Sequence, residues 1–142
     1  MIDNTDDANC KTEEKHNDAT LNRPAGDRVV DAPSVLVDLP RYIRQIKQED
    51  AWTKNDRNSI TVFKTRDMAI VLGGLRAGAE MPAHKAEGIM SIQLIHGSLD
   101  LNTDELSETM KAGQIAAIHK GCNYRLIAQE ESIYLLTICD VE

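Results

Sequence analysis

The sequence lacks the features that mark disulfide-rich, zinc-binding and membrane-spanning proteins. It has three cysteines, Cys10, Cys122 and Cys139, which are odd in number, widely spaced and without a CxxC or Cys/His pair at zinc-ligand spacing. This pattern fits free thiols in a reducing compartment better than a disulfide framework. No apolar stretch approaches the ~20 residues that a membrane-spanning helix needs. We therefore expect no membrane partner.

Basic and aromatic residues are also scarce. The formal net charge is −7, aromatic residues make up 4% of the chain, and no block is rich in lysine and arginine. Such a surface is a poor match for nucleic acid or for an anionic membrane. The amino terminus is acidic where a signal peptide needs a basic start. The sequence therefore predicts a cytoplasmic protein that binds no nucleic acid.

The first 28 residues contain scarcely a large apolar side chain. Seven acidic residues stand there with two lysines and two arginines. Such a segment buries too little surface to offset the entropy lost on ordering. We predict a disordered acidic tail over residues 1–28, with a partner-binding arm as the alternative. Residues 29–142 are predicted to form a single domain, because their number suits one core.

Two patterns follow the tail. In DAPSVLVDLP, apolar residues alternate with polar or small ones, which predicts a short strand around Val35, Val37 and Leu39. In the overlapping segment LPRYIRQIKQEDAW, the period changes and the apolar residues fall on one helical face. This segment predicts one short amphipathic helix.

From Ser59 onward the pattern is that of short strands. Turn signals recur about every eight to twelve residues, which is the spacing of an antiparallel β-sandwich or barrel. No segment of helical length intervenes, so a parallel βαβ sheet is excluded and the predicted class is all-β. The expected strands are SITVFKT, MAIVLGGL, IMSIQLI, SLDLN, LSETM, QIAAI, YRLIAQ and SIYLLTIC.

Two glycine-framed blocks lie within this region. Gly78 is followed after five residues by His84, and Gly97 closes the next strand; Gly113 is followed by QIAAIHKGCNY, which contains Gly121. These blocks resemble the two motifs of the cupin superfamily, over roughly residues 59–139. The resemblance implies a cupin-like (RmlC-like) double-stranded β-helix, a jelly-roll barrel that is often dimeric. Many cupins hold a divalent metal through three histidines and one carboxylate.

The metal-binding positions of the family differ in this chain. The resemblance places the first histidine at His84, the second at Ala86, the glutamate at Met90 and the last histidine at Tyr124. Alanine offers no ligand atom, and a methionine thioether suits copper(I) better than iron, manganese, zinc or nickel. We therefore expect no metal and no other cofactor at this site. The strand period further predicts that Met90 and Ile92 point into the barrel.

The leading functional hypothesis is a metal-free cupin-domain protein that binds a small molecule or acts as a regulatory module. Its expected pocket is lined by His84, Met90, Ile92 and Tyr124, without a catalytic residue. His84 could equally be an ordinary core histidine. We also expect a homodimer, because cupins commonly pair through a sheet face and the outward Ile89 and Ile95 are apolar.

Two alternatives of another class remain open. One is a metal-dependent cupin enzyme, of the dioxygenase, isomerase or hydrolase type, with substitute ligands around His84. Its possible ligands are His84, Glu87, His96, His119, Cys122 and Tyr124. The other is a metal-free acid–base enzyme that uses His84 and Tyr124, because histidine exchanges protons near neutral pH.

Overall fold

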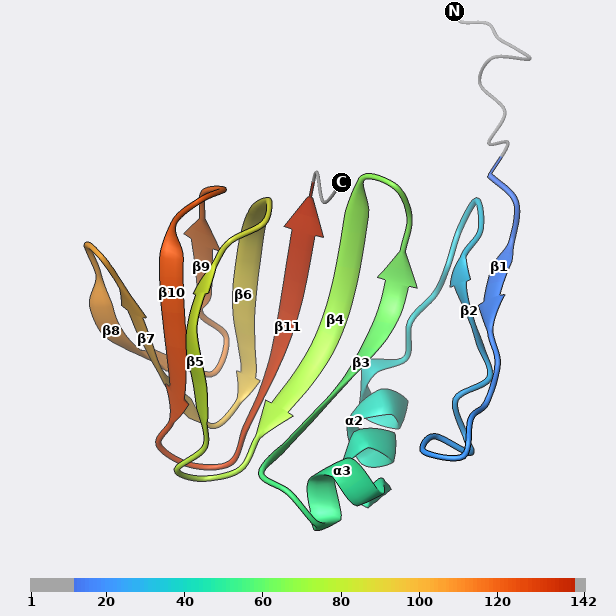
Figure 1. The fold of residues 1–142 in the computed structure, drawn as a ribbon, viewed down its shortest axis with the longest axis horizontal. Coiled ribbons are helices and arrows are strands. Elements are labelled where there is room, and N and C mark those ends of the chain that lie inside the picture. The colour runs from blue at the N-terminus through green and yellow to red at the C-terminus, as the bar shows by residue number, and fades with distance from the viewer. Residues whose placement is uncertain (1–11, 140–142) are drawn as a thin grey trace, which may run out of the picture.

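The computed structural model describes residues 12–139, which form two β-sheets packed face to face, with two helices and an N-terminal hairpin beside the larger sheet (Figure 1). The helices are α2 (Leu39–Gln48) and α3 (Asp50–Thr53). The strands are β1 (Lys15–Asn17), β2 (Arg28–Asp31), β3 (Arg57–Lys64), β4 (Met68–Leu75), β5 (Glu80–Lys85), β6 (Ile89–His96), β7 (Ser98–Thr103), β8 (Ser107–Lys111), β9 (Ile115–Ile118), β10 (Asn123–Ala128) and β11 (Ser132–Cys139).

The sheet order confirms the predicted all-β architecture. One sheet has four strands in the order β5-β10-β7-β8, and the other has five in the order β3-β4-β11-β6-β9. All pairs in both sheets are antiparallel. Several neighbours, such as β5 with β10 and β4 with β11, are distant in sequence, as in a jelly roll. Each of the eight strands expected from Ser59 onward is present.

Two apolar cores lie on opposite faces of the five-stranded sheet. The larger fills the space between the sheets and includes Met90, Ile92 and Leu94, all buried as the strand period predicted. The smaller lies between α2 and the outer face of the sheet and includes Ile46 and Leu72. Each fully buried side chain of this size stabilises the fold by about 1.5–3 kcal/mol. The two cores fix both the barrel and the helices on it.

The helical segment is interrupted once. Asp38 caps α2 because its carboxylate accepts a hydrogen bond from the Arg41 amide at 3.3 Å. At Glu49 the backbone is extended, with φ −81° and ψ 154°, so α3 begins as a separate turn. The prediction of a single helix was therefore wrong at this residue. Within residues 12–139, no helix is long and apolar enough to cross a membrane.

Two local predictions differ from the structure. The expected strand over residues 35–39 does not form: its residues before α2 pair with no sheet, Leu36 is fully exposed, and Val37 packs against the smaller core. Conversely, β5 was missed because Pro82 interrupts its pattern. Proline lacks the N–H group of a sheet ladder, but β5 is an edge strand, where proline is tolerated.

The predicted disordered tail differs from the structure over residues 12–28. There β1 pairs with β2, with His16 opposite Val29. Residues 1–11 lie outside the described part. We call residues 12–31 the N-terminal arm; it lies beside α2 and β3 (Figure 1). Hydrophobic periodicity does not reveal this segment, because polar contacts hold it.

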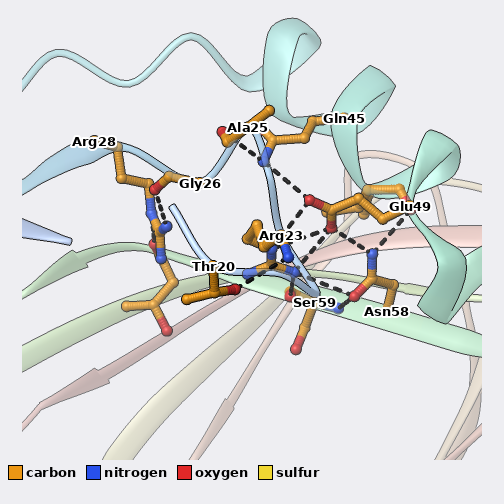
Figure 2. Close-up of polar contacts among 11 residues, drawn as sticks. Thr20, Arg23, Ala25, Gly26, Arg28, Gln45, Glu49, Asn58 and Ser59 are labelled. Carbon is orange, nitrogen blue, oxygen red and sulfur yellow. Dashed lines mark hydrogen bonds and ion pairs between the residues drawn. The ribbon is translucent and has the colours of Figure 1, made fainter. Parts of the chain in front are cut away.

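Arg23 makes most of these contacts (Figure 2). Its Nε donates to both Glu49 carboxylate oxygens at 3.1 Å, and its terminal nitrogen forms an ion pair with Glu49 at 3.0 Å. The same nitrogen donates to Asn58 Oδ1 at 3.2 Å and to the Ser59 carbonyl at 2.6 Å. One guanidinium thus joins the arm to the end of α2 and to β3.

Glu49 is the centre of this network. Its carboxylate also accepts hydrogen bonds from Asn58 Nδ2 at 2.9 Å and from Gln45 Nε2 at 3.1 Å. Burial by itself would raise the pKa of Glu49, but the hydrogen bonds from Asn58, Arg23 and Gln45 outweigh it and hold the pKa below its ordinary value. The ionised carboxylate is therefore the form that the fold stabilises.

Two arginines of the arm also cover the free edge of β3. The Arg76 amide donates to the Asp56 carbonyl at 2.9 Å, so before the register shift that follows Thr61 the even-numbered residues bond β4 and the odd-numbered ones face outward. The outward Ser59 carbonyl accepts from Arg23 at 2.6 Å, and the Thr61 carbonyl accepts from Arg28 Nε at 2.8 Å. Side chains of the arm thus replace a missing neighbouring strand.

Candidate ligand-binding site

The four glycines that frame the two sequence motifs have a common conformation. Gly78, Gly97, Gly113 and Gly121 have φ values of 85°, 99°, 94° and 86°, a region that other residues rarely adopt. At Gly97 space is also short: a Cβ atom would lie 2.3 Å from the Glu131 carbonyl oxygen. The glycine pattern therefore has a conformational cause at each turn.

The positions matched to the family's metal ligands gather at one end of the barrel. His84 on β5 is opposite Tyr124 on β10, and their ring centroids are 6.0 Å apart. Ala86, Met90 and Tyr124 are buried in the larger core, whereas His84 is exposed. The Ala86 amide donates to the Cys122 carbonyl at 2.8 Å, which joins the two motif loops.

One space that could hold a ligand adjoins β8 and β9, which are edge strands of the two sheets. Figure 1 shows the two strands. One hollow of about 300 Å³ and a second of about 370 Å³ adjoin there and share Leu101, Leu106, Ala116 and Ala117 as lining residues. We call the two hollows together the seam groove. Met90, Ile92 and Tyr124, which were expected to line a pocket, instead pack against other core side chains.

The seam groove combines an apolar floor with a polar rim. Leu101 and Ile118 form part of the floor and belong to the larger core, and Leu106 is 43% exposed. At one end the first hollow is also lined by Asp104, Glu105, His119 and Cys122. His119 and Cys122 were among the substitute metal ligands suggested by the sequence. The one sequence feature that points to the groove itself is Leu106, an apolar residue directly after the turn NTDE.

No family model and no curated protein matches the sequence. Among solved structures, the conserved protein SPY1581 of unknown function from Streptococcus pyogenes has a TM-score of 0.57 and 23% identity over 61% of this chain and 75% of that one. An RmlC-like cupin from Shewanella frigidimarina has a TM-score of 0.57 and 14% identity over 60% and 77%. This chain has an RmlC-like cupin fold.

A third similar structure is a mutant salicylate 1,2-dioxygenase from Pseudoaminobacter salicylatoxidans. Its TM-score is 0.69, with 12% identity over 79% of this chain and 36% of the dioxygenase. At identities this low, the comparisons show a common fold and not a common chemistry. The chemistry of this chain depends on its own residues.

The residues at the cupin metal positions do not fit the usual metals. Ala86 has no ligand atom, and Met90 offers only a soft thioether. Burial raises the pKa of Tyr124, and the negative charge of Glu87 raises it further, so its phenol stays protonated at neutral pH. A protonated phenol donates a hydrogen bond rather than acting as an anionic ligand. His84 alone does not make a metal centre.

The substitute ligands suggested from the sequence are not brought together either. Across residues 12–139, the group of three or more histidine, cysteine or acidic side chains whose ligand atoms lie within 4.8 Å of one another is His16, Asp18 and Asp27. All three are exposed on the N-terminal arm, outside the barrel. Of the suggested set, His119 and Cys122 share the seam groove.

Proposed function

We propose that this protein is a metal-free cupin-fold protein that binds a small molecule in the seam groove, as a binding or regulatory module rather than an enzyme. The observation that carries the proposal is the apolar space that adjoins β8 and β9. Its two hollows, of about 300 and 370 Å³, are at the small end of the range of ~300–1,000 Å³ that is typical of ligand sites.

The location of the groove supports this proposal over a site in the barrel centre. The centre holds buried side chains such as Leu94, Leu99 and Leu126, which are 0% exposed. In contrast, the groove reaches Leu101 and Ile118 of the core from outside. A ligand there would bury exposed apolar surface of Leu106, at a gain of about 25 cal/mol per Å².

A neutral apolar dye tests this function. Nile red should become fluorescent with the native protein, and Leu106→Ser should weaken its binding several-fold because the groove loses an apolar wall. Leu36→Ser is the matched control, since Leu36 is 100% exposed and lines neither hollow of the groove. Equal binding by the native protein and both variants would contradict a site in the groove.

The assembly and the compartment complete the proposal. Ile95 packs against the smaller core, which weakens its expected role in a dimer, but Ile89 is 53% exposed. We propose a homodimer through the face of β6 that carries Ile89. Sedimentation of the native protein at twice 15.8 kDa, with Ile89→Asp near 15.8 kDa, is the expected result.

The exposed Cys122 thiol supports a reducing, cytoplasmic location.

A further inference from the structure

The charges around the seam groove are of one sign. Asp104 and Glu105 line the first hollow, and Glu108 lines the second. Neither hollow has a lysine or arginine among its lining residues. Lys111 is the last residue of β8 and Lys120 follows His119, but neither lysine lines either hollow. The apolar floor therefore carries an acidic rim.

The acidic groups keep capacity for a ligand. Asp104 accepts one long hydrogen bond, from Asn123 Nδ2 at 3.5 Å, and all three carboxylates are on exposed residues. The structure gives Asp104, Glu105 and Glu108 no ion pair with a basic side chain within residues 12–139. A bound cation would therefore compete with water and not with an internal arginine or lysine.

We propose that the seam groove selects a small ligand that combines an apolar body with a cationic group. This inference rests on the proposed function, because it concerns the same groove. The apolar body would cover Leu101, Leu106 and Ala116, and the cationic group would lie toward Asp104 and Glu105. An anionic ligand of the same shape would meet like charges, which oppose binding.

Cys122 provides a reporter because it is exposed and lines the first hollow. In a Cys10→Ser/Cys139→Ser background it is the one remaining thiol. Its alkylation by neutral iodoacetamide can be followed by mass spectrometry. The probes are hexyltrimethylammonium, hexanol and hexanoate, which share a six-carbon chain and differ in charge. A ligand in the groove slows alkylation, so each probe yields a dissociation constant from its concentration dependence.

We expect hexyltrimethylammonium to bind roughly two- to fivefold more tightly than hexanol, and hexanoate to bind more weakly than hexanol, since exposed charge pairs contribute up to ~1 kcal/mol. Asp104→Asn/Glu105→Gln should bring the dissociation constants of the three probes closer together, because it removes two of the rim carboxylates. Glu13→Gln/Glu130→Gln also removes two negative charges, at exposed residues that line neither hollow, and is the charge-matched control.

The outcomes separate the two proposals. Equal binding of the three probes, or tightest binding of hexanoate, would overturn the charge selectivity and leave a small-molecule groove in place. An order of affinities that is unchanged in Asp104→Asn/Glu105→Gln would also overturn it, because the selectivity would then not come from these two carboxylates. If no probe slows alkylation of Cys122 at any concentration, both the groove function and its selectivity are overturned.

Discussion

Arg23→Ala should destabilise the protein by about 2 kcal/mol. The variant loses the ion pair with Glu49 and the hydrogen bonds to Asn58 and Ser59. The side chains of the pair are 23% and 9% exposed, so solvent screens the interaction only in part. A hydrogen bond to a charged group contributes ~1.5–3 kcal/mol. Glu49 keeps its bonds from Asn58 and Gln45, which places the loss near the lower end.

Urea denaturation followed by fluorescence measures this loss. Trp52 is the sole tryptophan and is buried. It lies in α3, the helix that begins directly after Glu49. Trypsin cleavage after Lys15 gives a second, local measurement and should be faster in the variant. Lys54→Ala is the control, because its ion pair with Asp50 has side chains 73% and 79% exposed and should contribute below ~1 kcal/mol.

Arg23 does not anchor the arm if Arg23→Ala changes the free energy of unfolding no more than Lys54→Ala and leaves cleavage after Lys15 unchanged. The arm would then be independent of the domain, as its composition alone predicted. Arg23→Lys should give an intermediate loss, since an ammonium group cannot bond Glu49, Asn58 and Ser59 in the same fixed geometry.

Three further results are expected. Because the folded-state pKa of Glu49 lies below its ordinary value of 4.5, the stability that its carboxylate contributes should be present above that pH and be lost as the pH falls through the folded pKa. Glu49→Gln should therefore reduce the change in the urea midpoint between pH 6 and pH 3. Gly97→Ala should cost more than ~2 kcal/mol in thermal unfolding, since φ is 99° and its Cβ would lie 2.3 Å from the Glu131 carbonyl, whereas Gly113→Ala, with open space, should cost less. Elemental analysis of protein purified without chelators should show no stoichiometric transition metal; one metal per chain that His84→Ala removes and His16→Ala keeps would instead support a metal cupin.

Much of the barrel was predictable because its rules are local. Alternation placed Met90 and Ile92 inside, and the glycine spacing placed turns where φ is positive. The arm and the break at Glu49 were missed because both depend on one arginine that contacts residues 26 and 35 positions away. Local sequence patterns do not predict contacts between residues so far apart in the chain.

The candidate site divides in the same way. The resemblance correctly brought His84 beside Tyr124, since strand register follows from the fold. It did not reveal the seam groove, which depends on how far the edges of two sheets stand apart. That separation is set by packing of the whole barrel and not by a motif. The exposure of His84 was not predicted either, because the sequence does not show that β5 is an edge strand.

The arginines on the edge of β3 have a consequence for behaviour at high concentration. An open row of carbonyl and amide groups can recruit a strand from another molecule, which starts domain swapping or amyloid-like growth. Arg23 and Arg28 occupy two acceptors of that row and place bulky charged groups there. A protease that removed the arm would therefore do more than shorten the chain. It would expose the unpaired edge of β3, an eight-residue strand. The intact protein should therefore aggregate more slowly during storage than the trimmed protein.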